Sequence, residues 1–163
     1  MRRSILVTAV AAGIAFSVVL SLVRSPAYAH CEVPCGIYDD HARVVLMLED
    51  ATTVGKAVDQ INALDSEGGA QAMNQMARWI ANKEIHATRI QDTIGQYFMT
   101  QRIKPKAPGS AEWDDYVTRL AEHHAVMVAA MKTKQGVDPQ AVEALRAAIQ
   151  RIGKYYPPPP HAH

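Results

Sequence analysis

The residues of this chain that could bind a metal stand together in the segment His-Cys-Glu-Val-Pro-Cys that ends at Cys35, and this segment contains both cysteines of the 163-residue sequence. Its C-x3-C spacing differs from the C-x-x-C of thioredoxin-like sites and from the C-x-x-C-H that attaches c-type haem. If His30 began the mature chain, its free amine, the deprotonated amide of Cys31 and the Cys31 thiolate would close two adjacent five-membered chelate rings. Pro34 and Gly36 favour a turn that brings the second thiolate to the fourth corner. Planar coordination by two nitrogens and two sulfurs suits Ni(II) or Cu(II), whereas Zn(II) prefers a tetrahedron.

The imidazole of His30 remains available as an axial ligand in this arrangement. An amidate and two thiolates are strong donors that stabilise a higher oxidation state, so a Ni(III)/Ni(II) couple comes within reach in water. Two other interpretations stay open. The same residues could serve an exported copper or nickel carrier, or Cys31 and Cys35 could form a disulfide that ties a structural helical bundle.

A mature chain that starts at His30 is what the preceding sequence predicts. A basic start is followed by an uncharged apolar run over residues 5–23 and by the A-x-A cleavage pattern at residues 27–29, which together are typical of a secretory signal peptide. We therefore expect residues 1–29 to be a cleaved leader and the mature protein to be periplasmic or extracellular, without stable membrane association. An uncleaved anchor is the alternative, because the run is long enough to span a bilayer. If the leader acts only as a maturation propeptide, a cytoplasmic location follows.

The charge of the chain changes when the leader is removed. The full sequence has 17 Lys and Arg against 16 Asp and Glu, and the leader contains three of the basic residues and no acidic ones. The remaining 134 residues thus have 14 basic and 16 acidic residues, a net charge of −2. Such a chain is no electrostatically driven nucleic-acid binder, and a small anion would have to be attracted by local charges.

The rest of the sequence predicts an all-α fold, an antiparallel four-helix bundle over residues 39–153. The irregular hook, residues 30–38, precedes it, and a tail rich in Pro and His, residues 154–163, follows. We expect the first helix to be capped by Asp39 or Asp40 and to end at the break 65–69. The second helix is expected over residues 70–98, the third from an N-cap at Ser110 to residue 135, and the fourth from Pro139 to Gly153.

Apolar side chains recur at helical spacing in the second and third of these helices and predict their core-facing sides. The expected core positions are Met73, Met76, Ala77, Ile80, Ala87, Ile90, Ile94 and Tyr97 in the second helix, and Trp113, Tyr116, Val117, Leu120, His124, Met127 and Met131 in the third.

The hook resembles the metal-binding segment of nickel superoxide dismutases. The matching residues are His30, Cys31, Pro34, Cys35, Gly36 and Tyr38, followed by Asp39. The motif is short but specific, because it must lie at a mature N-terminus. The resemblance extends loosely over the mature chain, since that family is a four-helix bundle of similar length, and Tyr97-Phe98 matches a Tyr-Phe near the end of its second helix.

The resemblance implies one nickel ion per subunit, held by His30, Cys31 and Cys35, that converts superoxide to oxygen and hydrogen peroxide. The His30 imidazole would bind axially in Ni(III) and swing away in Ni(II), and Tyr38 would stand over the open face and limit access. Pro34 would be cis, and Gly36 would belong to the same turn. Backbone amides around Glu32 and Cys35 would guide the anion. The family also implies a homohexamer with the hooks inside and a processing peptidase that exposes His30.

The sequence departs from the family at two points. Glu32 stands where the family often has Asp. The family orients its histidine with a Glu on the first helix and an Arg on the second, and these positions fall near Val45 or Leu46 and near Asn82. The nearest substitutes are Glu49 on the first helix and Lys83 or Arg78 on the second.

The other histidines are expected to be surface or hydrogen-bonded residues rather than metal ligands. They are His41, His86, His123 and His124 in the predicted helices. His161 and His163 end the tail, where solvated side chains are expected, with weak nickel uptake before delivery as the alternative.

Overall fold

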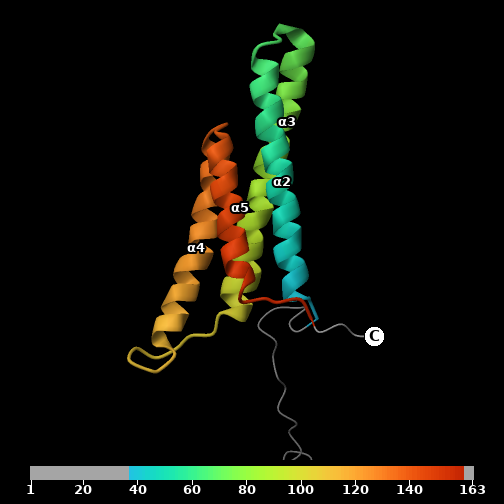
Figure 1. Cartoon of the computed structure of the whole chain (residues 1–163). Coiled ribbons are helices and arrows are strands. Elements are labelled where there is room, and N and C mark those ends of the chain that lie inside the picture. Colours follow the sequence, from blue (N-terminus) through green and yellow to red (C-terminus); the bar gives the residue numbers. More distant parts are fainter. Residues whose placement is uncertain (1–36, 160–163) are drawn as a thin grey trace, which may run out of the picture. The chain divides into compact units, whose positions relative to one another are not determined.

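The structure is a computed structural model that describes residues 37–159. The predicted leader, the hook up to Gly36, and His161 and His163 lie outside the described residues. Within the described range there are four helices and no strand (Figure 1): α2 Asp40–Asp65, α3 Gly69–Asp92 with its continuation η1 Thr93–Arg102, α4 Trp113–Gln135, and α5 Pro139–Gly153. This confirms the all-α helical bundle. No helix in this range has the length and apolar character needed to cross a membrane.

Three sequence signals define the helix ends as predicted. The Asp39 side chain caps α2 by accepting from the backbone N–H of Ala42. Asp138 caps α5 in the same way by accepting from the N–H of Gln140, and Pro139 occupies the first helical position. The turn between α2 and α3 uses Gly68 and Gly69 at φ 66° and 79°, a left-handed conformation that strains other residues.

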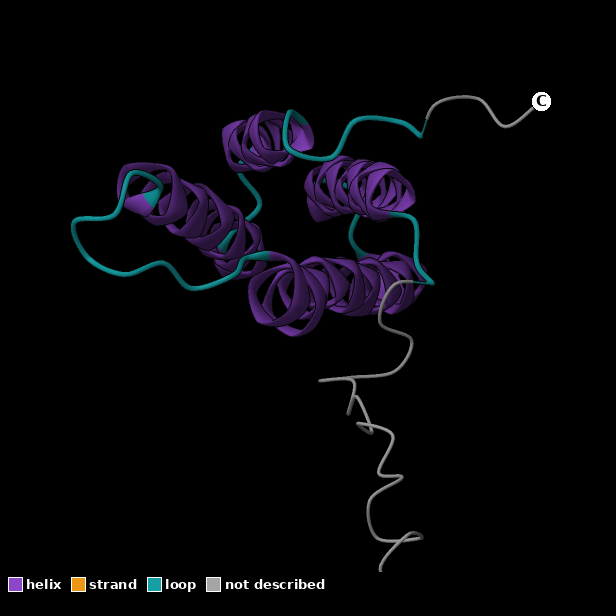
Figure 2. Ribbon diagram, turned by 90° about the horizontal axis from the view of Figure 1, so that it is seen from below, coloured by secondary structure: helices purple, strands orange, loops and turns teal. Residues whose placement is uncertain are grey.

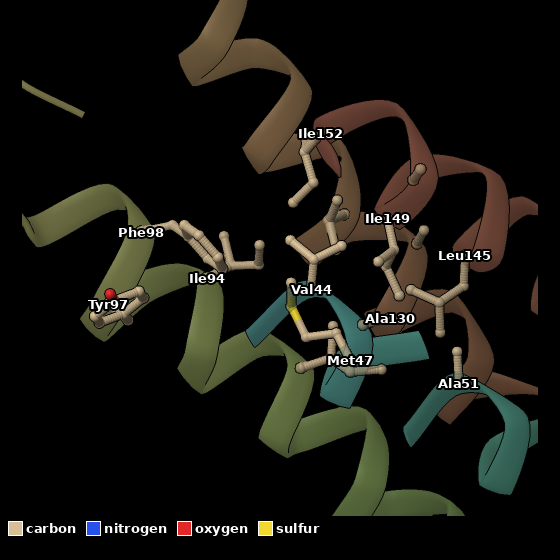
Figure 3. Packing of buried hydrophobic residues seen from close by; sticks show 14 of the residues in the cluster. Val44, Met47, Ala51, Ile94, Tyr97, Phe98, Ala130, Leu145, Ile149 and Ile152 are labelled. Atoms are coloured by element: carbon tan, nitrogen blue, oxygen red, sulfur yellow. The ribbon is translucent and has the colours of Figure 1, made fainter. Parts of the chain in front are cut away.

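The four helices pack in a closed order around one core. α2 contacts α3, α3 contacts α4, α4 contacts α5, and α5 returns to α2, as the view along the bundle shows (Figure 2). Figure 3 shows the centre of the core, with Met47 from α2, Phe98 from η1 and Leu145 from α5 among its buried side chains. Burying one such side chain contributes about 1.5–3 kcal/mol.

The N-terminal half of α3 is not covered as the apolar spacing predicted. Met73 is 70% exposed, Ile80 is 43% exposed and Ala77 is exposed as well, so all three were wrong as core positions. The hairpin of α2 and α3 extends beyond the neighbouring ends of α4 and α5 (Figure 1). Helical periodicity shows that a face is apolar, but the length of the neighbouring helices decides whether that face is covered.

The face of α4 also differs from the prediction. Its buried residues are His123, Val126, Ala129, Ala130 and Thr133. Of the predicted positions, Met127 is half-buried and packs against the core, and Trp113, Tyr116 and Leu120 are half-buried. Val117, His124 and Met131 are exposed, so they were wrong as core positions. Small Ala side chains allow close helix approach, and the two polar residues are accepted inside because their polar atoms are hydrogen-bonded. The predicted N-cap at Ser110 is wrong as well, because α4 begins at Trp113, whose N–H is bonded to the Ser110 carbonyl in the preceding turn.

Lys83 is a buried cation that completes the C-terminal end of α4. The residue is only 4% exposed, and its Nζ donates to the carbonyl of Lys134 at 3.0 Å and to that of Gly136 at 2.7 Å. Carbonyls at the end of a helix lack intrahelical partners, and a cation satisfies them well. Lys83 is therefore committed to this cap, which corrects its assignment as a substitute residue for orienting His30.

We expect Lys83→Met to lower the free energy of unfolding by about 1–3 kcal/mol, because it leaves the carbonyls of Lys134 and Gly136 without their buried donor. Urea denaturation measures this. Lys56→Met, at an exposed position of α2, is the control and should change stability by less than about 0.5 kcal/mol. Equal stability of the two variants would contradict the capping role.

His123 joins α4 to the segment after α5. Its Nδ1–H donates to the Arg119 carbonyl at 2.7 Å, and Nε2 accepts from the Tyr156 hydroxyl at 2.9 Å. The Tyr156 carbonyl in turn accepts from His41 at 3.1 Å. Tyr156 is 6% exposed and its ring packs against that of Phe98, with the centroids 4.4 Å apart, so the core includes a residue that the sequence placed in the tail. Burial lowers the pKa of His123 from 6.5.

A pH dependence of stability follows from this burial. The pKa of His123 is lower in the folded than in the unfolded chain. The stabilisation that this neutral histidine contributes is therefore fully present above about pH 6.5. As the pH falls below that value, the free energy of unfolding decreases by up to about 1.4 kcal/mol per pH unit. Urea denaturation at about pH 7.5 and about pH 5 tests this against His123→Gln, whose stability should depend less on pH. His124→Gln, at an exposed position, should keep the wild-type slope; a matching slope for all three proteins would refute the assignment.

Candidate functional site

The part of the predicted site that the structure describes begins directly after the hook. His30, Cys31, Glu32, Pro34, Cys35 and Gly36 lie outside the described residues, whereas Tyr38 and Glu49 lie within them. No group of three or more His, Cys, Asp or Glu side chains in the described part of the chain could hold a metal ion.

Tyr38 lies two residues before α2 and makes three contacts. The residue is 43% exposed, and its ring lies 5.9 Å from the ring of Tyr97, centroid to centroid. The guanidinium carbon of Arg43 is 3.8 Å from the centroid of the Tyr38 ring. The Tyr38 carbonyl lies 3.3 Å from the Tyr97 hydroxyl. The structure therefore brings together Tyr38 and Tyr97, two residues 59 positions apart.

The Tyr97 hydroxyl is part of a charged network. It donates to Asp40 Oδ1 at 2.5 Å, while Asp40 Oδ2 accepts from Arg102 Nε at 2.8 Å. Burial, followed by the hydrogen bond to Asp40, raises the pKa of Tyr97 to about 12. Tyr97 therefore remains protonated at physiological pH and acts as a donor. Charge-assisted bonds of this kind are stronger than neutral ones, so the network anchors the start of α2 to the end of η1.

Tyr97 and Arg102 of this network both lie in η1, which has a π-helical conformation. The N–H of Ile103 bonds to the Phe98 carbonyl five residues back, at 3.0 Å. A π-helix is wider than an α-helix, is rare in proteins and is frequently found at functional sites. Here the consecutive residues Tyr97 and Phe98 are both buried, at 8% and 0% exposure. The helix reaches Arg102 rather than ending at Phe98 as predicted, and this extension supplies the cation that pairs with Asp40.

Glu49 lies further along α2 and lines a groove of about 510 Å³ that Arg43, Asp50 and Asp92 also line. Of these carboxylates, Asp50 accepts a hydrogen bond from His86 Nδ1 at 2.5 Å and lies 4.0 Å from Arg89. Glu49 is exposed. His86, like His41 and His123, is hydrogen-bonded, as expected.

A family model of nickel-containing superoxide dismutases matches residues 25–158 of this chain. The chain belongs to this family. The match spans the whole hook, Tyr38 and all four helices. Neither a search of curated proteins nor a search of solved structures found a match.

This superoxide dismutase is therefore an oxidoreductase of a nickel-containing family that acts on superoxide. Sequence reasoning identified Tyr38 and the Tyr97-Phe98 pair, but it missed Arg43, Asp40 and Arg102. Asp40 was noted only as a possible helix cap, and Arg102 was placed beyond the end of the second helix. Nothing in their local sequence indicates that they meet, because 62 positions separate them.

We expect Asp40→Asn to lower the pKa of Tyr97 below about 12, since the charge and the strong acceptor that favour the phenol are lost, while burial still keeps the pKa above its ordinary value. Ultraviolet titration of phenolate formation, with Tyr97→Phe to assign the transition, measures this. Asp59→Asn, which removes an exposed carboxylate elsewhere on α2, should leave the pKa of Tyr97 unchanged. An unchanged titration in Asp40→Asn would refute the network.

Proposed function

We propose that the chain, trimmed to begin at His30, binds one nickel ion and disproportionates superoxide. The ligands would be the His30 amine and imidazole, the Cys31 amide and thiolate, and the Cys35 thiolate. The chemistry of this donor set fits nickel, because an amidate and two thiolates favour a planar, strongly bound Ni(II) and stabilise a higher oxidation state. The observation that carries the proposal is the family match, which includes the hook and the described bundle.

When bound, nickel supplies a one-electron Ni(III)/Ni(II) couple. In the overall reaction one superoxide loses an electron and becomes oxygen, while a second gains an electron and two protons and becomes hydrogen peroxide. The protein residues control access. Tyr38 is the residue we assign to the open face, and its ring is supported by Tyr97 and Arg43. A pre-positioned ring needs no reorganisation when a small anion approaches.

Residues around the hook have supporting roles in this proposal. The backbone amides near Glu32 and Cys35 would donate to the anion, and Pro34 and Gly36 would shape the turn. Glu49 is the candidate to orient the His30 imidazole, supported by its exposed carboxylate in the groove that reaches Arg43. Ligand histidines generally need such a partner for their second nitrogen.

We also propose that signal peptidase or a dedicated protease exposes His30 and that the exported enzyme is a homohexamer. The apolar side chains that are exposed on α2, α3 and α4 are available for subunit contacts, because burial between copies would remove apolar area from water. They include Val45, Leu46, Met73, Ile80, Ile85, Val117 and Met131. Enclosure in an assembly would also protect the thiolates from the peroxide that the enzyme forms.

The intact mass and metal content of the protein from its native host test this function. The proposal requires a chain that starts at His30, close to one nickel per chain, a rhombic Ni(III) signal in electron spin resonance, and superoxide turnover. Any other N-terminus would contradict it. Reversible copper binding without turnover would favour the carrier, and a Cys31–Cys35 disulfide with full stability in the absence of metal would favour the structural bundle. A fully active monomer in sedimentation would refute the hexamer.

We expect Cys31→Ser and Cys35→Ser each to lose nickel and to lower superoxide turnover by more than about 100-fold. The loss of a metal ligand should have a larger effect than the loss of a residue that only orients a ligand, which costs about 10- to 100-fold. Metal analysis and a superoxide decay assay measure this. His124→Ala, at an exposed position of α4, should retain both. Retention of nickel and activity in either serine variant would rule out the hook as the metal site.

A further inference from the structure

We propose that Arg43 attracts superoxide to the face of the site covered by Tyr38. This inference rests on the proposed function, in which Tyr38 stands between solvent and the metal. The guanidinium carbon of Arg43 lies 3.8 Å from the centroid of the Tyr38 ring, and Tyr38 is 43% exposed. The cation therefore lies at the residue past which an anion would approach.

Net charge does not supply this attraction. The mature chain has a net charge of −2, so its overall field repels superoxide weakly. Fixed charges near an opening can still raise the encounter rate, because their field acts over about one Debye length, roughly 10 Å at 0.1 M salt. A steering cation for this enzyme must accordingly lie close to the opening.

Arg43 differs from the neighbouring cation in forming no ion pair with an acidic residue of the described range, residues 37–159. Arg102 is paired with Asp40, so their charges largely cancel. None of the ion pairs found in the described part of the chain includes Arg43. Its Nε is enclosed and has no hydrogen-bond partner among the residues that the structure describes. The Asp39 carboxylate accepts from the Ala42 N–H in the first turn of α2.

The groove that Arg43 lines also contains three carboxylates, those of Glu49, Asp50 and Asp92. Asp50 is hydrogen-bonded to His86 at 2.5 Å, and none of the three forms an ion pair with Arg43. Glu49 is six positions along α2 from Arg43, about 9 Å along the axis, close to one Debye length at 0.1 M salt. The Arg43 guanidinium, in contrast, is in direct contact with the half-exposed Tyr38 ring, so it places a positive charge at that ring on a mildly acidic protein.

The test measures kcat/KM for superoxide as a function of ionic strength, using nickel-loaded protein that begins at His30. We expect Arg43→Gln to lower kcat/KM by about two- to five-fold at low ionic strength, with the difference shrinking as salt is raised from about 0.05 to 0.5 M. Arg43→Lys, which keeps the charge, should retain most of the rate and the salt dependence. Nickel content and the electron spin resonance signal of each variant show whether the metal site is intact.

Lys56→Gln is the matched control for the loss of one positive charge. Lys56 is exposed on the same helix and lies 13 positions from Arg43, about 20 Å along the axis, which is about two Debye lengths at 0.1 M. It should show the wild-type rate and salt dependence. If Arg43→Gln reduces nickel loading, Arg43→Met, which keeps much of the side-chain stem, makes the same comparison.

Two results would overturn the inference and leave the proposed function intact. One is a wild-type salt dependence and rate for Arg43→Gln. The other is an equal, salt-independent loss in Arg43→Gln and Arg43→Lys, which would show that Arg43 only supports the Tyr38 ring. Absence of superoxide turnover in the nickel-loaded wild-type protein would instead contradict the proposed function and, with it, the steering role.

Discussion

The hydrogen bond from the Tyr97 hydroxyl to Asp40 connects the two ends of the chain's longest helical hairpin at the point where the hook meets the bundle. Asp40 is the first residue of α2, and Arg102, its ionic partner, is the last residue of η1. The network has a buried, protonated donor and a carboxylate whose two oxygens are both engaged. Such a network tolerates few alternative arrangements, because a separated partner would leave a partly buried charge unpaired. The position of Tyr38 depends on it.

The same end of the bundle is tied together by a second polar connection. Tyr156, beyond the last helix, contacts His123 through its hydroxyl and His41 through its carbonyl. Phe98 packs against both Tyr156 and His123. One aromatic cluster thereby joins the start of α2, the π-helical segment, α4 and the C-terminal segment. Tyr38, the residue expected on the substrate-facing side of the hook, contacts this connected end of the bundle through Tyr97.

Most of the helices could be predicted from local signals. The errors in the predicted burial of their side chains have one physical origin, which is that burial depends on neighbours distant in sequence. Asp39 and Asp138 cap the helices that their sequence positions indicate. Met73 and Ile80 were assigned to the core because periodicity identifies an apolar face without showing how far the neighbouring helices extend. Lys83 and His123 are buried because partners distant in sequence satisfy them, namely the carbonyls at the end of α4 and the Tyr156 hydroxyl. The π-helical turns of η1 have no sequence signature in the pattern of apolar residues.

By itself, the sequence determined the family and the chemistry that the hook offers. A His-Cys-x-x-Pro-Cys-Gly-x-Tyr motif directly after an A-x-A pattern is local information, because chelate rings and a cleavage site are built from adjacent residues. The tertiary structure alone decided what surrounds Tyr38. The pairing of Asp40 with Arg102, the protonated Tyr97 and the contact of Arg43 with the Tyr38 ring depend on how the chain packs at the start of α2 and the end of η1. The physical reason is that a side chain's charge environment is set by its neighbours in space, and here those neighbours come from opposite ends of a helical hairpin.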